Sequence, residues 1–247
     1  MIQSMRKCCF QILLLPAFAF AQRPLQVTLD SITSSDSNSL HRKFTITYHV
    51  KNNTDEPLSF FLHPNTLIAN AASSMTLYAV YKIYQNDAFQ DMDGPFFPNI
   101  PEAIQFEDFP NHNSPEARDF IKKVTENHKA EYAALLENYR KKGGKSTDEK
   151  WIVRNQKLLL SKLTLQPAET KTFAIQTTWN RIRIVNNGDL EYYLNENDRF
   201  DFELVLDLKK ALFKSDLSEP EFNQIKDDKH FIEGVFTSNK MPVNFGE

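Results

Sequence analysis

The stretch Phe44-Thr-Ile-Thr-Tyr-His-Val-Lys51 decides the fold class of this chain. Its apolar side chains stand at every second position and alternate with polar ones. Successive side chains of a β-strand point to opposite faces, so this period predicts a strand with one buried and one solvated face. The turn-forming run Asn52-Asn-Thr-Asp-Glu-Pro57 follows directly, and another apolar run begins at Leu58. The chain therefore contains a strand, a tight turn and a second strand.

Similar alternation recurs on both sides of a different middle segment. It is found before the quoted stretch, in 25–32, and after residue 163, in 172–179, 200–209 and 231–237. Segment 77–84 is apolar on both faces, which is typical of a strand that is covered on both sides. These observations predict a mainly β protein, an antiparallel β-sandwich, with a helical insertion.

The middle segment carries the signals of two helices. Ser114-Pro115-Glu116 supplies an N-cap, a proline at the first helical position and an acid in the first turn. An apolar stripe with a period near 3.6 residues then runs to Gly143. Ser146-Thr-Asp-Glu149 has the spacing of a capping box and opens a second helix. Residues 114–162 are predicted to form a helical hairpin that covers the second face of 77–84.

Residues 86–113, between strand and hairpin, form an acidic loop rich in phenylalanine and proline, without lysine or arginine. Long loops inside compact domains are uncommon and often functional. Either the phenylalanines dock the loop on the sheets, or the loop presents them to a partner. A second candidate surface is the basic tip of the hairpin, which is either a solvated turn or a contact for an acidic surface or phosphate groups. The candidate partner residues are Phe96, Phe97, Phe106, Phe109, Lys141, Lys142 and Lys145.

Two segments carry a resemblance to a known kind of domain. Residues 48–60, Tyr-His-Val-Lys-Asn-Asn-Thr-Asp-Glu-Pro-Leu-Ser-Phe, resemble the strand–turn–strand of bacterial immunoglobulin-like β-sandwiches. Residues 164–173, Thr-Leu-Gln-Pro-Ala-Glu-Thr-Lys-Thr-Phe, are similar to their Leu-x-Pro-Gly-Glu turn, with Ala168 where glycine is usual. The resemblance implies one immunoglobulin-like domain over 22–247, interrupted by the loop and the hairpin. It implies no activity.

The first 21 residues have the order of a secretory signal. Arg6 and Lys7 precede an uncharged, mostly apolar run over 8–20, which closes on Ala19-Phe20-Ala21. Cleavage is expected after Ala21, and removing 21 of the 247 residues leaves a mature chain of 226. Both cysteines, Cys8 and Cys9, leave with the signal. The mature protein is therefore expected to be exported, periplasmic or extracellular, and held together without disulfides.

Composition excludes several other classes. Without Arg6 and Lys7 the chain keeps 27 basic and 32 acidic residues, a formal charge of −5, which argues against nucleic-acid binding. No later stretch is long and apolar enough to span a membrane, so a soluble protein is expected. The six histidines show no close metal-binding pair, and no nucleophile or phosphate-binding motif is present. We expect no catalytic residue, cofactor or metal.

Three functional hypotheses remain at this point. The first is a non-enzymatic binding or accessory protein of the bacterial envelope, whose partner is a protein or glycan and whose partner surface is the loop and hairpin. The second is a hydrolase of envelope polymers that uses carboxylates or His112 near the insertion, since a glycosidase needs only two carboxylates. The third is a protease-inhibitor-like sandwich that presents an extended loop.

Overall fold

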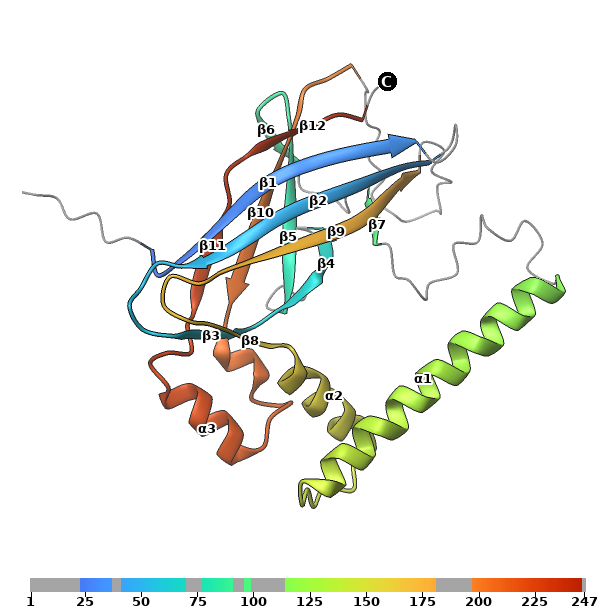
Figure 1. Cartoon of the computed structure of the whole chain (residues 1–247), viewed down its shortest axis with the longest axis vertical. Helices are drawn as coiled ribbons and strands as arrows, with labels where there is room; N and C mark the ends of the chain where they lie inside the picture. Colours follow the sequence, from blue (N-terminus) through green and yellow to red (C-terminus); the bar gives the residue numbers. More distant parts are fainter. Residues whose placement is uncertain are drawn as a thin grey trace, which may run out of the picture.

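The computed structural model describes residues 23–36, 41–69, 77–90, 96–98, 114–180 and 197–245. The predicted signal segment and its cleavage point after Ala21 lie outside these residues. The described part is mainly β, with several sheets and three α-helices (Figure 1). The predicted mainly β class is confirmed.

The first sheet contains the stretch that decides the fold class. Its strands lie in the order β1-β2-β9-β7, and every pair is antiparallel. In β2 the apolar side chains Phe44, Ile46, Tyr48 and Val50 are each at most 1% exposed. The alternation thus identified the buried face correctly. The strands are β1 (Leu25–Asp36), β2 (His41–Asn52), β7 (Phe96–Pro98) and β9 (Thr170–Asn180).

The second sheet is mixed. Its main order is β11-β10-β5-β4, with β12 also paired to β10 and β6 paired to β5. β4 and β5 run parallel, so the expectation of a fully antiparallel arrangement is wrong at this pair. The strands are β4 (His63–Ala69), β5 (Tyr78–Gln85), β6 (Ala88–Gln90), β10 (Phe200–Leu208), β11 (Gly234–Thr237) and β12 (Met241–Val243).

The two sheets share one hydrophobic core. Inward side chains of β1, β2 and β9 form a single buried cluster with those of β4, β5, β10, β11 and β12. Tyr48 lies in this cluster, where its hydroxyl donates to the carbonyl of Pro64 over 3.0 Å. Burial raises the pKa of Tyr48 well above its ordinary value. Core packing between the sheets is therefore what holds the β part together.

The long helix α1 (Pro115–Lys141) begins as the sequence predicts. The Ser114 hydroxyl accepts the Ala117 N–H over 3.1 Å, and Pro115 occupies the first turn. The next helix, α2 (Glu149–Leu160), begins differently from the prediction. Asp148, not Ser146, is its N-cap, and its carboxylate accepts the Trp151 N–H over 3.0 Å. The Ser146 N–H donates instead to the Tyr139 hydroxyl, which keeps Ser146 in the turn between the helices.

The two helices differ greatly in length. At 1.5 Å per residue, the 27 residues of α1 span roughly 40 Å and the 12 residues of α2 roughly 18 Å. They pack along the C-terminal part of α1, where Leu135 and Leu136 are buried and Asn138 bonds Gln156. The rest of α1 extends away from the sheets (Figure 1). None of the described helices is both long and apolar enough to cross a membrane.

The apolar side of α2 packs at the start of the segment that the hairpin was expected to cover. Leu158 joins a second buried cluster with Phe61 of β3 (Leu58–Phe61) and Ile225 of α3 (Glu219–Asp227), and Leu77 packs against this cluster. β3 pairs with β8 (Lys162–Leu165), which leaves α2 directly. The fully buried Asn155 locks the arrangement by donating to the Asp216 carbonyl and the Glu221 carboxylate. The position of α2 thus follows from contacts with the C-terminal helices, including the short η2 (Lys210–Phe213).

Candidate binding sites

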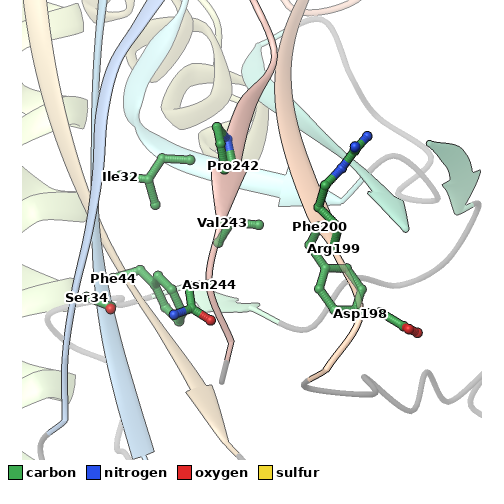
Figure 2. A pocket seen from close by; sticks show the side chains of 9 residues that line it. All are labelled: Ile32, Ser34, Phe44, Asp198, Arg199, Phe200, Pro242, Val243 and Asn244. Atoms are coloured by element: carbon green, nitrogen blue, oxygen red, sulfur yellow. The ribbon is translucent and has the colours of Figure 1, made fainter. Parts of the chain in front are cut away.

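Four strand ends meet at one end of the two sheets, which we call the cleft end. β1 finishes there, β2 and β10 start there, and β12 finishes there. A cavity of about 280 Å³ opens between these strands (Figure 2). Loops and strand ends at one end of a two-sheet fold are a common place for binding residues. The described lining residues are Ile32, Ser34, Phe44, Asp198, Arg199, Phe200, Pro242, Val243 and Asn244.

Aromatic rings form the base of the cleft end. The Phe245 ring lies 5.5 Å from that of Phe44, 5.1 Å from that of Phe200 and 5.2 Å from that of Trp179, measured between centroids. Phe44 and Phe200 also line the cavity, and both are almost fully buried. Phe245 thus contacts the other three rings in tilted or edge-to-face geometry, which holds them firmly in place. The cavity therefore has a floor suited to an apolar group.

Charged groups surround the cavity but do not point into it. In Figure 2 the side chains of Asp198 and Arg199 extend away from Ile32 and Phe44. Gln85 donates to the Asp198 carboxylate, and the Arg199 guanidinium binds the carboxylate of Asp87. Arg199 also pairs with Asp201 of β10 at 3.3 Å. These charges are already partnered, and the described lining of the cavity combines apolar side chains such as Ile32 and Val243 with polar ones such as Ser34 and Asn244.

A buried arginine ties the C-terminal strand to the first sheet beside the cavity. The Arg42 Nε donates to the Asp36 carboxylate over 2.7 Å, and Arg42 Nη1 reaches the carbonyl of Asn244 at 3.5 Å. Arg42 is only 5% exposed, and Asp36 is its bidentate partner. A planar guanidinium with two parallel bonds fixes geometry as well as charge. Arg42 of β2 thus links the end of β1 and the residue after β12 at the cleft end.

The cavity lacks the arrangement that a glycosidase requires. Of its described lining residues, Asp198 alone carries a carboxylate, and Gln85 already binds it. A glycosidase needs two carboxylates that face each other across the substrate. Within the part of the chain that the structure describes, no three His, Cys, Asp or Glu side chains are grouped to hold a metal ion. His112 lies outside the described residues. The described lining of this cavity therefore does not hold the facing carboxylate pair of a glycosidase.

The candidate phenylalanines divide into two pairs. Phe96 and Phe97 lie on β7, which forms the edge of the first sheet and pairs with β9 at Trp179 and Thr178. β7 thus lies at the cleft end, since Thr177 of β9 is the register partner of Phe44. Phe106 and Phe109 lie outside the described residues. At least one piece of the predicted loop is therefore docked on the sheet as a strand.

The three candidate lysines lie elsewhere. Lys141 ends α1 and pairs with Glu137 at 2.7 Å, while Lys142 and Lys145 are exposed in the turn before α2. Gly143 adopts a positive φ of 80°, and the Gly144 backbone lies against the Tyr139 ring. In Figure 1 this turn is at the bottom of the view, well separated from β7. The sequence grouped Phe96, Phe97 and these lysines into one partner surface, but the structure separates them.

Sequence reasoning missed the cavity, because its lining comes from segments more than 150 residues apart. Ile32 and Phe200 were recognised only as members of alternating strands. No local pattern marks which strand ends enclose a space. Comparisons of the chain with protein-family models, with curated proteins and with solved structures find no match.

Proposed function

We propose that this chain is an exported, non-enzymatic binding or accessory protein of the bacterial envelope, and that it holds an apolar group of its partner at the cleft end. The observation that carries the proposal is the cavity of about 280 Å³ with an aromatic floor, at a point where four strand ends meet. Binding sites are typically concave, mostly apolar and bordered by a few polar groups. The partner is a protein or glycan of the envelope.

The proposal includes an immunoglobulin-like β-sandwich interrupted by the helical hairpin. Two turns support this, because they are the segments that carry the resemblance and they meet at Asn52. The Asn52 amide donates to the carbonyls of Glu56 in one turn and of Leu165 and Gln166 in the other. Ala168 adopts a φ of 59°, the conformation for which glycine is favoured at this position of the related turn.

Export is supported by the N-terminal sequence. A basic start, an apolar run and a small-x-small site occur in that order, and both cysteines precede the proposed cut after Ala21. A protein that relies on a shared apolar core instead of disulfides can still be stable in an oxidising compartment. The proposed location is the periplasm or the extracellular space.

Substitutions at two neighbouring residues, Ser34 and Thr33, test whether the cleft end binds a partner. Ser34 pairs with Phe44 across β1 and β2 and lines the cavity, whereas Thr33 pairs with Thr45 on the other face. We expect Ser34→Trp to fill the cavity and abolish capture of partners from an envelope extract, and Thr33→Trp to leave capture unchanged. Both side chains are exposed, so both variants should fold. If Ser34→Trp captures the same partners as the unaltered protein, the cleft end is not the binding site.

A further inference from the structure

Two leucines stand out on the surface at the other end of the sheets. Leu160, the last residue of α2, is 73% exposed, and Leu212 of η2 is 58% exposed. They are the two most exposed large apolar side chains that the structure describes. Most leucines in a folded protein are buried, since removing an apolar side chain from water stabilises the fold. Two such residues at one place therefore need an explanation.

The two leucines lie next in sequence to residues of one buried cluster. Leu158 of α2 and Phe213 of η2 both pack in the second cluster, and the Phe213 ring lies 5.0 Å from that of Phe61. Phe61 is the register partner of Lys162, two residues after Leu160. The buried side chains of this junction thus pack together, while Leu160 and Leu212 stay exposed.

Lysines border the same junction. The ammonium groups of Lys162 and Lys210 lie 5.9 Å and 5.8 Å from the centre of the Phe231 ring, which itself contacts Phe61. Cation–π contacts of this kind hold the long lysine side chains in place. Neither lysine forms an ion pair with a carboxylate of the described residues, although the Lys210 ammonium also donates to the Asp228 carbonyl. We call Leu160, Lys162, Lys210 and Leu212 the leucine–lysine surface.

We propose that the leucine–lysine surface docks on an anionic lipid bilayer. Two protruding apolar side chains next to two unneutralised cations fit a surface that offers negative head groups above a hydrocarbon interior. Charge complementarity favours this occupant over an apolar protein groove, which would leave both lysines without a counter-charge. The contact is peripheral, since none of the described helices is suited to crossing a membrane. It is independent of the cleft end, which lies at the other end of the sheets.

The test measures co-sedimentation of the full chain with vesicles of phosphatidylcholine alone and of phosphatidylcholine with phosphatidylglycerol. All variants carry the same N-terminus, because the apolar run at 8–20 can itself enter vesicles. Three double variants are compared: Leu160→Ser with Leu212→Ser, Lys162→Gln with Lys210→Gln, and Lys122→Gln with Lys123→Gln. The third is the matched control, as it removes the same charge from exposed positions of α1.

The unaltered chain should bind the anionic vesicles more tightly than the neutral ones. The Lys162/Lys210 variant should lose about five-fold in partition coefficient per lysine, since each contributes about 1 kcal/mol near an anionic membrane. The Leu160/Leu212 variant should lose about ten-fold or more. The control variant should bind as the unaltered chain does. Leu160, Lys162 and Leu212 are exposed and Lys210 is partly buried, so thermal melting is used to confirm the folding of each variant.

Three results would overturn the proposal. Equal loss in the control and in the Lys162/Lys210 variant would mean that net charge alone attracts the lipid. Unchanged binding of the leucine variant would mean that no apolar insertion takes place. Failure of the unaltered chain to prefer anionic vesicles, together with capture of an acidic protein that depends on Lys162 and Lys210, would assign the surface to a protein partner instead.

Discussion

The side-chain amide of Asn239 binds both main-chain groups of Leu29 at the open edge of β1. The Leu29 N–H donates to Asn239 Oδ1 over 2.8 Å, and Asn239 Nδ2 donates to the Leu29 carbonyl over 3.3 Å. Leu29 stands just before the point where β1 shifts register against β2, and Asn239 lies between β11 and β12. One side chain therefore joins the edges of the two sheets. An edge left open would be a template for pairing with another chain.

Asn239→Ala should lower the free energy of unfolding by about 1 kcal/mol, the usual net value of such hydrogen bonds at a partly exposed site. Urea denaturation followed by circular dichroism measures it. Asn53→Ala is the control, since Asn53 donates a single long bond of 3.4 Å to the Arg23 carbonyl. The control should change stability by less than about 0.5 kcal/mol. Equal stability of the two variants would contradict the role given to Asn239.

Asn52→Asp should be far more destabilising, by about 3 kcal/mol or more. Asn52 is fully buried, and the substitution replaces its donor group with an oxygen that faces the carbonyls of Leu165 and Gln166. Its present acceptor oxygen receives the Thr54 N–H and hydroxyl, so the amide is satisfied on both sides. Asn53→Asp, one residue along, should have little effect. Chemical denaturation measures the free energy of unfolding of both variants. Similar free energies for the two would mean that the two turns are not linked through Asn52.

Ala168→Gly should stabilise the protein by about 0.5–1 kcal/mol. Ala168 adopts a φ of 59°, where a Cβ is unfavourable and glycine is not. Ala174→Gly in the middle of β9 is the opposite control and should destabilise by about the same amount. Melting temperatures of the two variants should therefore move in opposite directions. A lower melting temperature for Ala168→Gly would show that the turn does not gain from glycine.

His63 should make stability depend on pH. Burial, and to a lesser extent the charge of Lys157, lowers the pKa of His63 below its ordinary value of 6.5. The unfolded chain then binds this proton more tightly, so the contribution of His63 to stability is present above about pH 6.5 and is lost as the pH falls below it. His63→Phe keeps a ring against Tyr78, whose ring lies 5.4 Å away, and removes the titration.

The measurement compares the free energy of unfolding at about pH 7.5 and about pH 5.5, on either side of the unfolded pKa. The unaltered protein should lose more stability between these two values than His63→Phe does. Equal losses would mean that groups other than His63 account for the dependence on pH.

Short-range features of the fold were predictable from sequence. The alternation in 44–51 identified the buried face of β2, and Ser114 with Pro115 marked the start of α1. These predictions depend on residues within a few positions of each other. The N-cap of α2 was misplaced because Ser146 and Asp148 both suit the role, and only the contact of Ser146 with the Tyr139 hydroxyl separates them.

Long-range features were not predictable in the same way. No local pattern indicated that Leu158 of α2 would pack with Phe61 and Ile225, or that the buried amide of Asn155 would bond Glu221 of α3. The expected antiparallel sheet contains the parallel pair β4 and β5, because a strand pattern carries no information on direction. The lysines near 141–145 and the phenylalanines of β7 were assigned to one inserted segment. The 27-residue helix α1 places these lysines far from β7.

The sequence by itself determined that this chain is mainly β with helices in its middle, where its buried strand faces lie, and where an export signal is expected. Only the tertiary structure decided which strand ends enclose the cavity, which asparagines join distant segments and which leucines stay exposed. The physical reason is the separation along the chain of the residues that must interact. Periodicity and capping are satisfied by neighbours along the chain, whereas a cavity, a buried amide or an exposed apolar surface depends on which distant segments pack together.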